Sequence, residues 1–132
     1  AFLFFRTSQS SITGNGTMRV GYNSVDSGSN YADRSSSYGN ADGTNTNQSG
    51  FNEWDTGAVE RFDVLNMPNI ASKEKLVIGH GNILSANGAG TAPYRREYVA
   101  KWANTSNQIT QIDAIMNSGN FTGGTLKVWG AD

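Results

Sequence analysis

The 132-residue chain contains no cysteine, which excludes disulfides and thiolate metal ligands, so its stability must come from packing and assembly. Its net charge is only −1, and its Lys and Arg residues are scattered along the sequence. That pattern disfavours nucleic-acid binding, which requires a basic surface. Long hydrophobic runs are also lacking. The apolar stretch at residues 1–5 is too short to span a bilayer, so we expect no membrane association.

Histidine is equally scarce, since His80 is the only one and lies between two glycines. No cluster of histidines can therefore hold a metal, and we favour a structural role for His80 over catalysis. Four carboxylates could form an acid–base pair of the glycosidase type, but nothing in the sequence positions a partner for them. These are Glu53, Asp55, Glu60 and Asp63. We expect a protein that is not an enzyme and that needs no cofactor.

What the chain has in excess is Asn, Ser, Thr and Gly, which fill about four positions in ten. Good helix formers such as Ala, Leu, Glu and Lys are few. Asn and Gly tolerate positive φ, and Ser and Thr satisfy turn backbones, so this composition predicts many short strands joined by turns. We predict an all-β fold, an antiparallel β-sandwich of about eight or nine strands in one domain spanning residues 1–132.

The strands are predicted from alternating or β-branched apolar residues bounded by turn signals. Residues 75–81 form a short apolar run that is typical of a strand buried on both faces. The segment at 58–67 could be a helix by spacing, but Pro68 and its β-branched content favour a strand. The strands predicted by residue range are 2–5, 17–23, 58–67, 75–81, 93–102, 108–116 and 125–129.

A long polar region at residues 23–50 separates the early strands from the rest. Its sizeable side chains are Val25, Tyr31, Arg34 and Tyr38. A loop of this length is either functional or a solvated excursion, and the sequence leaves both open. If it is functional, Tyr31, Arg34 and Tyr38 are its candidate anchors, because Tyr and Arg are enriched at interface hot spots.

Two acidic turns in this region, at residues 26–30 and 42–47, offer oxygen atoms at alternate positions, as calcium requires. Neither matches the EF-hand loop, and the same residues form ordinary Asx turns. We predict no metal site.

The C-terminal part predicts a hairpin made by residues 108–116 and 125–129. Phe121 lies in the connector between Asn120 and Thr122, where an apolar ring is expected to fold back and plug the core. In the second strand Trp129 alternates with Val128, so one of the two faces outward or into an interface.

This ending also carries a resemblance. The pattern W, I-T-x-I, S-G-x-F-x-x-G-T and V-W-G, together with Y-N-S-V-D-S-G-S-N-Y at residues 22–31, resembles a jelly-roll-like domain of virion structural proteins from tailed bacteriophages. The matched residues mark turns and core positions rather than an activity. They are Trp102, Ile109, Ile112, Phe121, Gly124, Val128 and Trp129.

The resemblance implies a capsid decoration or cement subunit on the virion surface, bound to the major capsid protein and to copies of itself, as a monomer or a trimer. A tail or fibre component is an alternative. A carbohydrate-binding module is another, with Trp54, Trp102, Trp129 and the Tyr residues, Tyr31 and Tyr38 among them, as stacking platforms. The candidate interface residues for the virion hypothesis are Phe2, Phe4, Phe5, Tyr31, Arg34 and Tyr38.

Overall fold

The computed structural model describes residues 16–54, 60–84, 86–116, 120–121 and 124–130. The described residues form strands, turns and extended segments, and none of them lies in a helix. The strands are β1 (Gly16–Tyr22), β2 (Ser24–Val25), β3 (Tyr31–Ser37), β4 (Gly43–Gln48), β5 (Phe51–Trp54), β6 (Glu60–Asn66), β7 (Lys75–Leu84), β8 (Tyr94–Trp102) and β9 (Gln111–Met116).

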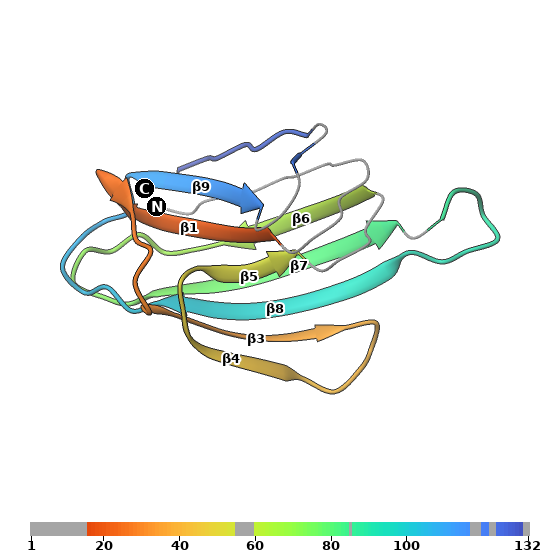
Figure 1. The fold of residues 1–132 in the computed structure, drawn as a ribbon, viewed down its shortest axis with the longest axis horizontal. Helices are drawn as coiled ribbons and strands as arrows, with labels where there is room; N and C mark the ends of the chain where they lie inside the picture. The colour runs from red at the N-terminus through yellow and green to blue at the C-terminus, as the bar shows by residue number, and fades with distance from the viewer. Residues whose placement is uncertain (1–15, 55–59, 85, 117–119, 122–123, 131–132) are drawn as a thin grey trace.

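The strands form two antiparallel sheets that lie one over the other (Figure 1). In the smaller sheet β1 pairs with β2, β5 and β9. In the larger sheet the strand order is β4-β3-β8-β7-β6. The prediction of an all-β antiparallel sandwich is confirmed, while jelly-roll connectivity remains a prediction.

The core lies between the sheets because each long strand turns alternate side chains inward. From β1 come Met18 and Val20, and from β8 come Tyr98 and Trp102, all buried. Just before β9, Ile109 is also buried. The core roles predicted for Trp102 and Ile109 are therefore confirmed, and Ile112 packs against the same cluster.

The hydroxyl group of Tyr31 links the two sheets. Tyr31, on β3, reaches across the core, where its hydroxyl donates to the carbonyl of Val20 at 2.8 Å or to that of Asp26 at 2.8 Å. The same oxygen accepts the backbone N–H of Val20 at 3.1 Å. Its ring packs edge-on against Phe51, with centroids 4.9 Å apart. The hydroxyl of Tyr31 thus supplies an acceptor for the Val20 N–H inside the core.

The prediction of a long loop at residues 23–50 is wrong, because this region contains β2 and the hairpin β3–β4. Inward positions of β3 hold Tyr31 and Asp33, and Asp33 accepts a hydrogen bond from Asn45 Nδ2 at 2.8 Å. β4 is an edge strand whose side chains are largely exposed, so it needs no apolar residue. Its polar composition therefore concealed it.

The predicted C-terminal hairpin is also wrong. β9 pairs with β1 over six residue pairs, and residues 124–130 form no strand. Phe121 is 37% exposed and does not plug the core, which Trp102, Tyr31 and Phe51 already fill. Gly124, with φ +139°, is exposed, as are Val128 and Trp129.

The first predicted strand, with Phe2, Phe4 and Phe5, lies outside the described residues.

Replacing Tyr31 with Phe should lower the free energy of unfolding by about 1–3 kcal/mol, because the Val20 N–H then stays buried without its acceptor. Urea denaturation followed by fluorescence measures this. The control is Tyr22→Phe, which removes the hydroxyl of an exposed tyrosine and should change stability by less than about 0.5 kcal/mol. Equal effects of the two substitutions would contradict the role given to Tyr31.

Stability should also fall at alkaline pH, because the Tyr31 hydroxyl ionises more readily in the unfolded chain than in the folded one. Burial raises the pKa of Tyr31 from 10.0 to about 12. Below pH 10 the hydroxyl is protonated in both folded and unfolded chains, so its contribution is complete. Between pH 10 and 12 only the unfolded chain ionises, and stability is progressively lost. Denaturation at pH 9 and pH 11 should show a larger loss for the parent protein than for Tyr31→Phe.

Candidate functional site

Three large apolar side chains stand exposed on the face of the five-stranded sheet that points away from the core, which we call the outer face. Leu76 and Ile78 on β7 are 57% and 56% exposed, and Val99 on β8 is 48% exposed. Ile78 and Val99 are opposite each other in the strand register, and Leu76 lies two residues from Ile78 on the same side. An open antiparallel sheet normally carries polar residues on its solvent face. A contiguous apolar group there marks an interaction site.

Shallow hollows flank Leu76 on both sides. One is lined by Pro68, Ile70 and Leu76 together with the stems of Lys73 and Glu74. The other runs over β3 and β4 and includes Arg34 and Val99 in its lining. Since Ile70 is also exposed, the apolar surface extends beyond the sheet into the turn that precedes β7.

Ion pairs surround the apolar centre and carry both signs of charge. Lys101 Nζ lies 2.9 Å from Glu74 Oε2. Arg95 and Glu97 are 3.7 Å apart, and Arg34 and Asp42 are 3.6 Å apart. These exposed pairs contribute little to stability. They form the polar rim that protein interfaces commonly place around an apolar core.

The outer face exists because Lys75 points inward. Its side chain is fully buried, and Nζ donates to the carbonyls of Ala71 at 3.1 Å, Lys73 at 2.8 Å and Asn104 at 2.7 Å. The ammonium also lies 5.3 Å from the centre of the Trp102 ring. Burial lowers the pKa of Lys75. With Lys75 inward, strand alternation turns Leu76 and Ile78 outward.

The prediction that residues 75–81 are buried on both faces is therefore wrong. Val77 and Gly79 are buried, but Leu76, Ile78 and His80 are exposed. The sequence shows an apolar run and does not show which side of it lacks a covering layer. The pairing of exposed apolar residues on β7 with Val99 on β8 is the signal that sequence reasoning missed.

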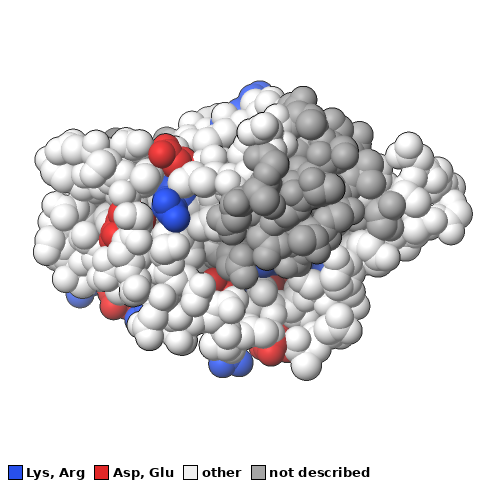
Figure 2. Space-filling view, in the orientation of Figure 1, with Lys and Arg blue, Asp and Glu red and all other residues white. Residues whose placement is uncertain are grey.

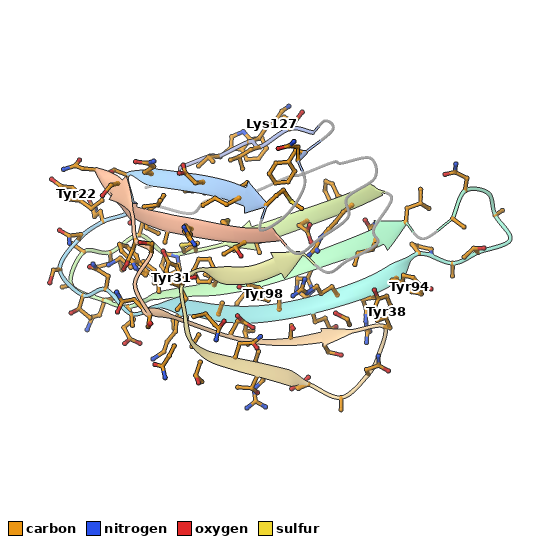
Figure 3. The ribbon with its side chains drawn as sticks, viewed as in Figure 1. Tyr22, Tyr31, Tyr38, Tyr94, Tyr98 and Lys127 are labelled. Atoms are coloured by element: carbon orange, nitrogen blue, oxygen red, sulfur yellow. The ribbon has the colours of Figure 1, made fainter. Side chains whose placement is uncertain are left out.

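The candidate anchors from residues 23–50 separate into two groups. Tyr31 is a core residue, so its proposed role as an interface anchor is withdrawn. Arg34 is exposed on the outer face, opposite Val99 in the register. Tyr38 is exposed and packs edge-on against Tyr94 at 4.2 Å, at the far end of the sheet (Figure 3).

Among the described aromatic residues, two of the rings that a carbohydrate-binding module would use lie in the core. Trp102 is in the core, and Trp129 is exposed on the C-terminal segment. The side chain of Trp54 lies outside the described residues. Burial of Trp102 and Tyr31 removes two of the rings on which that hypothesis depends.

The turn at Asp26 is a structural element rather than a cation site. Asp26 Oδ2 accepts hydrogen bonds from Trp102 Nε1 at 2.8 Å and Asn30 Nδ2 at 2.9 Å. Its Oδ1 accepts the N–H of Gly28 at 2.8 Å. The carboxylate is thus committed to donors within the chain.

A cluster that could bind a metal ion is not found in the described part of the chain. Its residues contain no group of three or more His, Asp or Glu side chains placed to hold a metal ion. Of the four carboxylates considered for acid–base chemistry, Asp63 is buried and bonded to Arg61, with Arg61 Nη2 to Oδ1 at 2.9 Å. The side chains of the other three lie outside the described residues.

The charge distribution agrees with the low net charge. Figure 2 shows Lys, Arg, Asp and Glu scattered among uncharged residues on the visible face. Among the described residues, no helix is long and apolar enough to cross a membrane.

Acid should weaken the fold through Asp26. Burial would raise the pKa of Asp26, but the hydrogen bonds from Trp102, the Gly28 N–H and Asn30 outweigh it and hold the pKa below its ordinary value of 3.8. The carboxylate therefore stabilises the fold at pH values above 3.8, and this contribution is lost as pH falls further.

Asp26→Asn should be less stable than the parent at pH 6, by about 1–3 kcal/mol, because an amide nitrogen would face other donors. The difference should shrink towards pH 2.5. The control, Asp42→Asn, alters an exposed ion pair and should leave stability at pH 6 nearly unchanged.

In comparisons with known proteins, the chain matches no protein-family model, no curated protein and no solved structure. The functional assignment therefore depends on the outer face and on the sequence resemblance.

Proposed function

We propose that this protein is a non-enzymatic structural subunit of a bacteriophage particle, a decoration or cement protein that binds the assembled head and stabilises it. The observation that carries the proposal is the outer face, where Leu76, Ile78 and Val99 form an apolar centre inside a charged rim. Such a surface supports binding to a protein, either the head or a second copy of the subunit.

The low charge of the chain supports the same mode of action. With a net charge of −1, long-range electrostatic attraction contributes little to association. Affinity then comes from buried apolar area and from hydrogen bonds, which act at contact. A subunit of this kind recognises a surface only once that surface has its final shape, as a cement protein must.

The resemblance in the C-terminal residues supports a phage particle as the binding partner, and multivalent binding explains how the subunit would hold on to it. A shell presents many equivalent sites, so a subunit that touches more than one neighbour gains affinity by avidity. Its partners are the major capsid protein and other copies of itself. Copy number separates head from tail: hundreds of copies per particle indicate the head, and a few dozen or fewer indicate the tail or fibre.

The proposal is tested by removing the apolar centre. Leu76→Thr combined with Ile78→Thr keeps β propensity and removes two exposed apolar side chains, so the domain should stay folded. Its affinity for particles should fall at least tenfold, since an anchor at the centre of an interface contributes more than about 1 kcal/mol. Quantitative electrophoresis of purified particles measures occupancy.

The control is Tyr22→Thr, which removes an exposed ring from the smaller sheet and should leave occupancy unchanged. Raising the salt concentration should release little parent protein from the particles. Full occupancy of the double variant, or release by moderate salt alone, would contradict the proposal.

A further inference from the structure

We infer that the occupant of the outer face is a second copy of this chain, packed sheet against sheet about a twofold axis. The inference deepens the proposed function and rests on it for the link to the particle, because it assigns the outer face to contact between copies of the subunit rather than to direct contact with the head. It comes from the order of charges along β8, where Arg95, Glu97, Val99 and Lys101 point outward. An apolar residue thus has opposite charges two residues away on each side.

A twofold axis that passes over Val99, parallel to the sheet and perpendicular to β8, between the two outer faces, makes this order self-complementary. Rotation about that axis stacks β8 on β8 of the second copy in the opposite direction, so Val99 meets its equivalent. Lys101 of each copy then faces Glu97 of the other, which gives two equivalent contacts, as an isologous interface requires.

The neighbouring strands fit the same axis. Ile78 is opposite Val99 in the register, so it too lies near the axis and meets its equivalent. Leu76 faces the exposed His80 of the second copy, because these residues lie two positions to either side of Ile78. Arg34 is on the same row and approaches its equivalent, but each Arg34 has Asp42 of its own chain 3.6 Å away to offset the repulsion.

The distances allow these contacts. Packed sheets cross at about 30°, and two residues of a strand span about 7 Å, so opposed positions are displaced by about 3–4 Å. Lys and Glu side chains can bridge that displacement. Five strands of about seven residues cover about 550 Å² per copy, or about 1,100 Å² in total. That area is near the lower limit for a specific interface, so we expect a reversible dimer with a dissociation constant on the order of micromolar.

A second copy suits this surface better than a strongly charged partner. The rim carries both signs in near balance, and two chains of net charge −1 repel each other little. A dimer would also present two particle-binding surfaces at once. Breaking it would then lower occupancy by removing avidity.

Charge reversal tests the axis directly. Lys101→Glu should place two Glu pairs across the interface, and Glu97→Lys should place two Lys pairs there. Each variant alone should sediment as a monomer, with its affinity for a second copy weakened at least tenfold relative to the parent. Mixed together, the two variants should form a heterodimer, because both cross-contacts then join Glu to Lys. Sedimentation velocity of each variant and of the equimolar mixture measures this.

Lys127→Glu is the control, since it reverses an exposed charge on the C-terminal segment and should leave the dimer intact (Figure 3). A monomeric parent protein at 100 µM, on the order of a hundred times the expected dissociation constant, would overturn the inference. So would a mixture that remains monomeric while the parent dimerises. Particle occupancy separates the dimer from the proposed function. If the parent is monomeric and Leu76→Thr with Ile78→Thr still lowers particle occupancy, the outer face binds the capsid instead, and the proposed function survives. If the charge-reversal variants behave as expected but that double variant keeps full occupancy, the proposed function fails while the dimer stands.

Discussion

The hydroxyl of Tyr31 is the interaction on which the sandwich depends, because it joins the backbone of β1 to the larger sheet inside the core. The adjacent turn adds a second link, in which Asp26 accepts the indole N–H of Trp102. Two aromatic residues of the larger sheet are thus each fixed by a hydrogen bond at one end and by packing along the ring. The sheets cannot slide without leaving these buried polar groups unpaired, so the bonds set the register between layers.

The sequence predicts a strand correctly where its own residues carry the signal, and fails where the strand's position in the sheet decides which side chains are buried. The strands β6, β7 and β8 coincide with predicted segments, because their β-branched and aromatic content is a local signal. The sequence predicts a loop where the hairpin β3–β4 lies, since β4 is an uncharged polar edge strand with no apolar alternation. The role of Tyr31 was misjudged for the same reason. A Tyr among Ser, Asn and Asp looks exposed, and only the long-range pairing of β3 with β8 places it in the core.

The outer face was missed because strand alternation alone does not tell which side of β7 is covered. Lys side chains are almost never fully buried, so the sequence alone predicts that Lys75 faces solvent. Because side chains alternate along a strand, Leu76 and Ile78 would then be buried. The structure has the opposite arrangement, and a one-residue change of register exchanges the two faces completely. Three carbonyl acceptors and the Trp102 ring make the inward Lys75 tolerable, and they come from segments distant in sequence.

Packing around Gly79 shows why β7 cannot simply be reversed to hide its apolar residues. A Cβ atom at Gly79 would lie 2.3 Å from Leu65 Cδ2 and 3.3 Å from a Tyr98 ring carbon, so the inner side at this point has no room for a side chain. Reversal would bring Ile78 or His80 into that space and expose the ammonium site. The fold therefore keeps Leu76 and Ile78 outside at the cost of exposed apolar area and a buried lysine. A protein that covers the outer face would offset the exposed apolar area. The self-complementary order of charges on β8 favours a second copy of this chain as that protein.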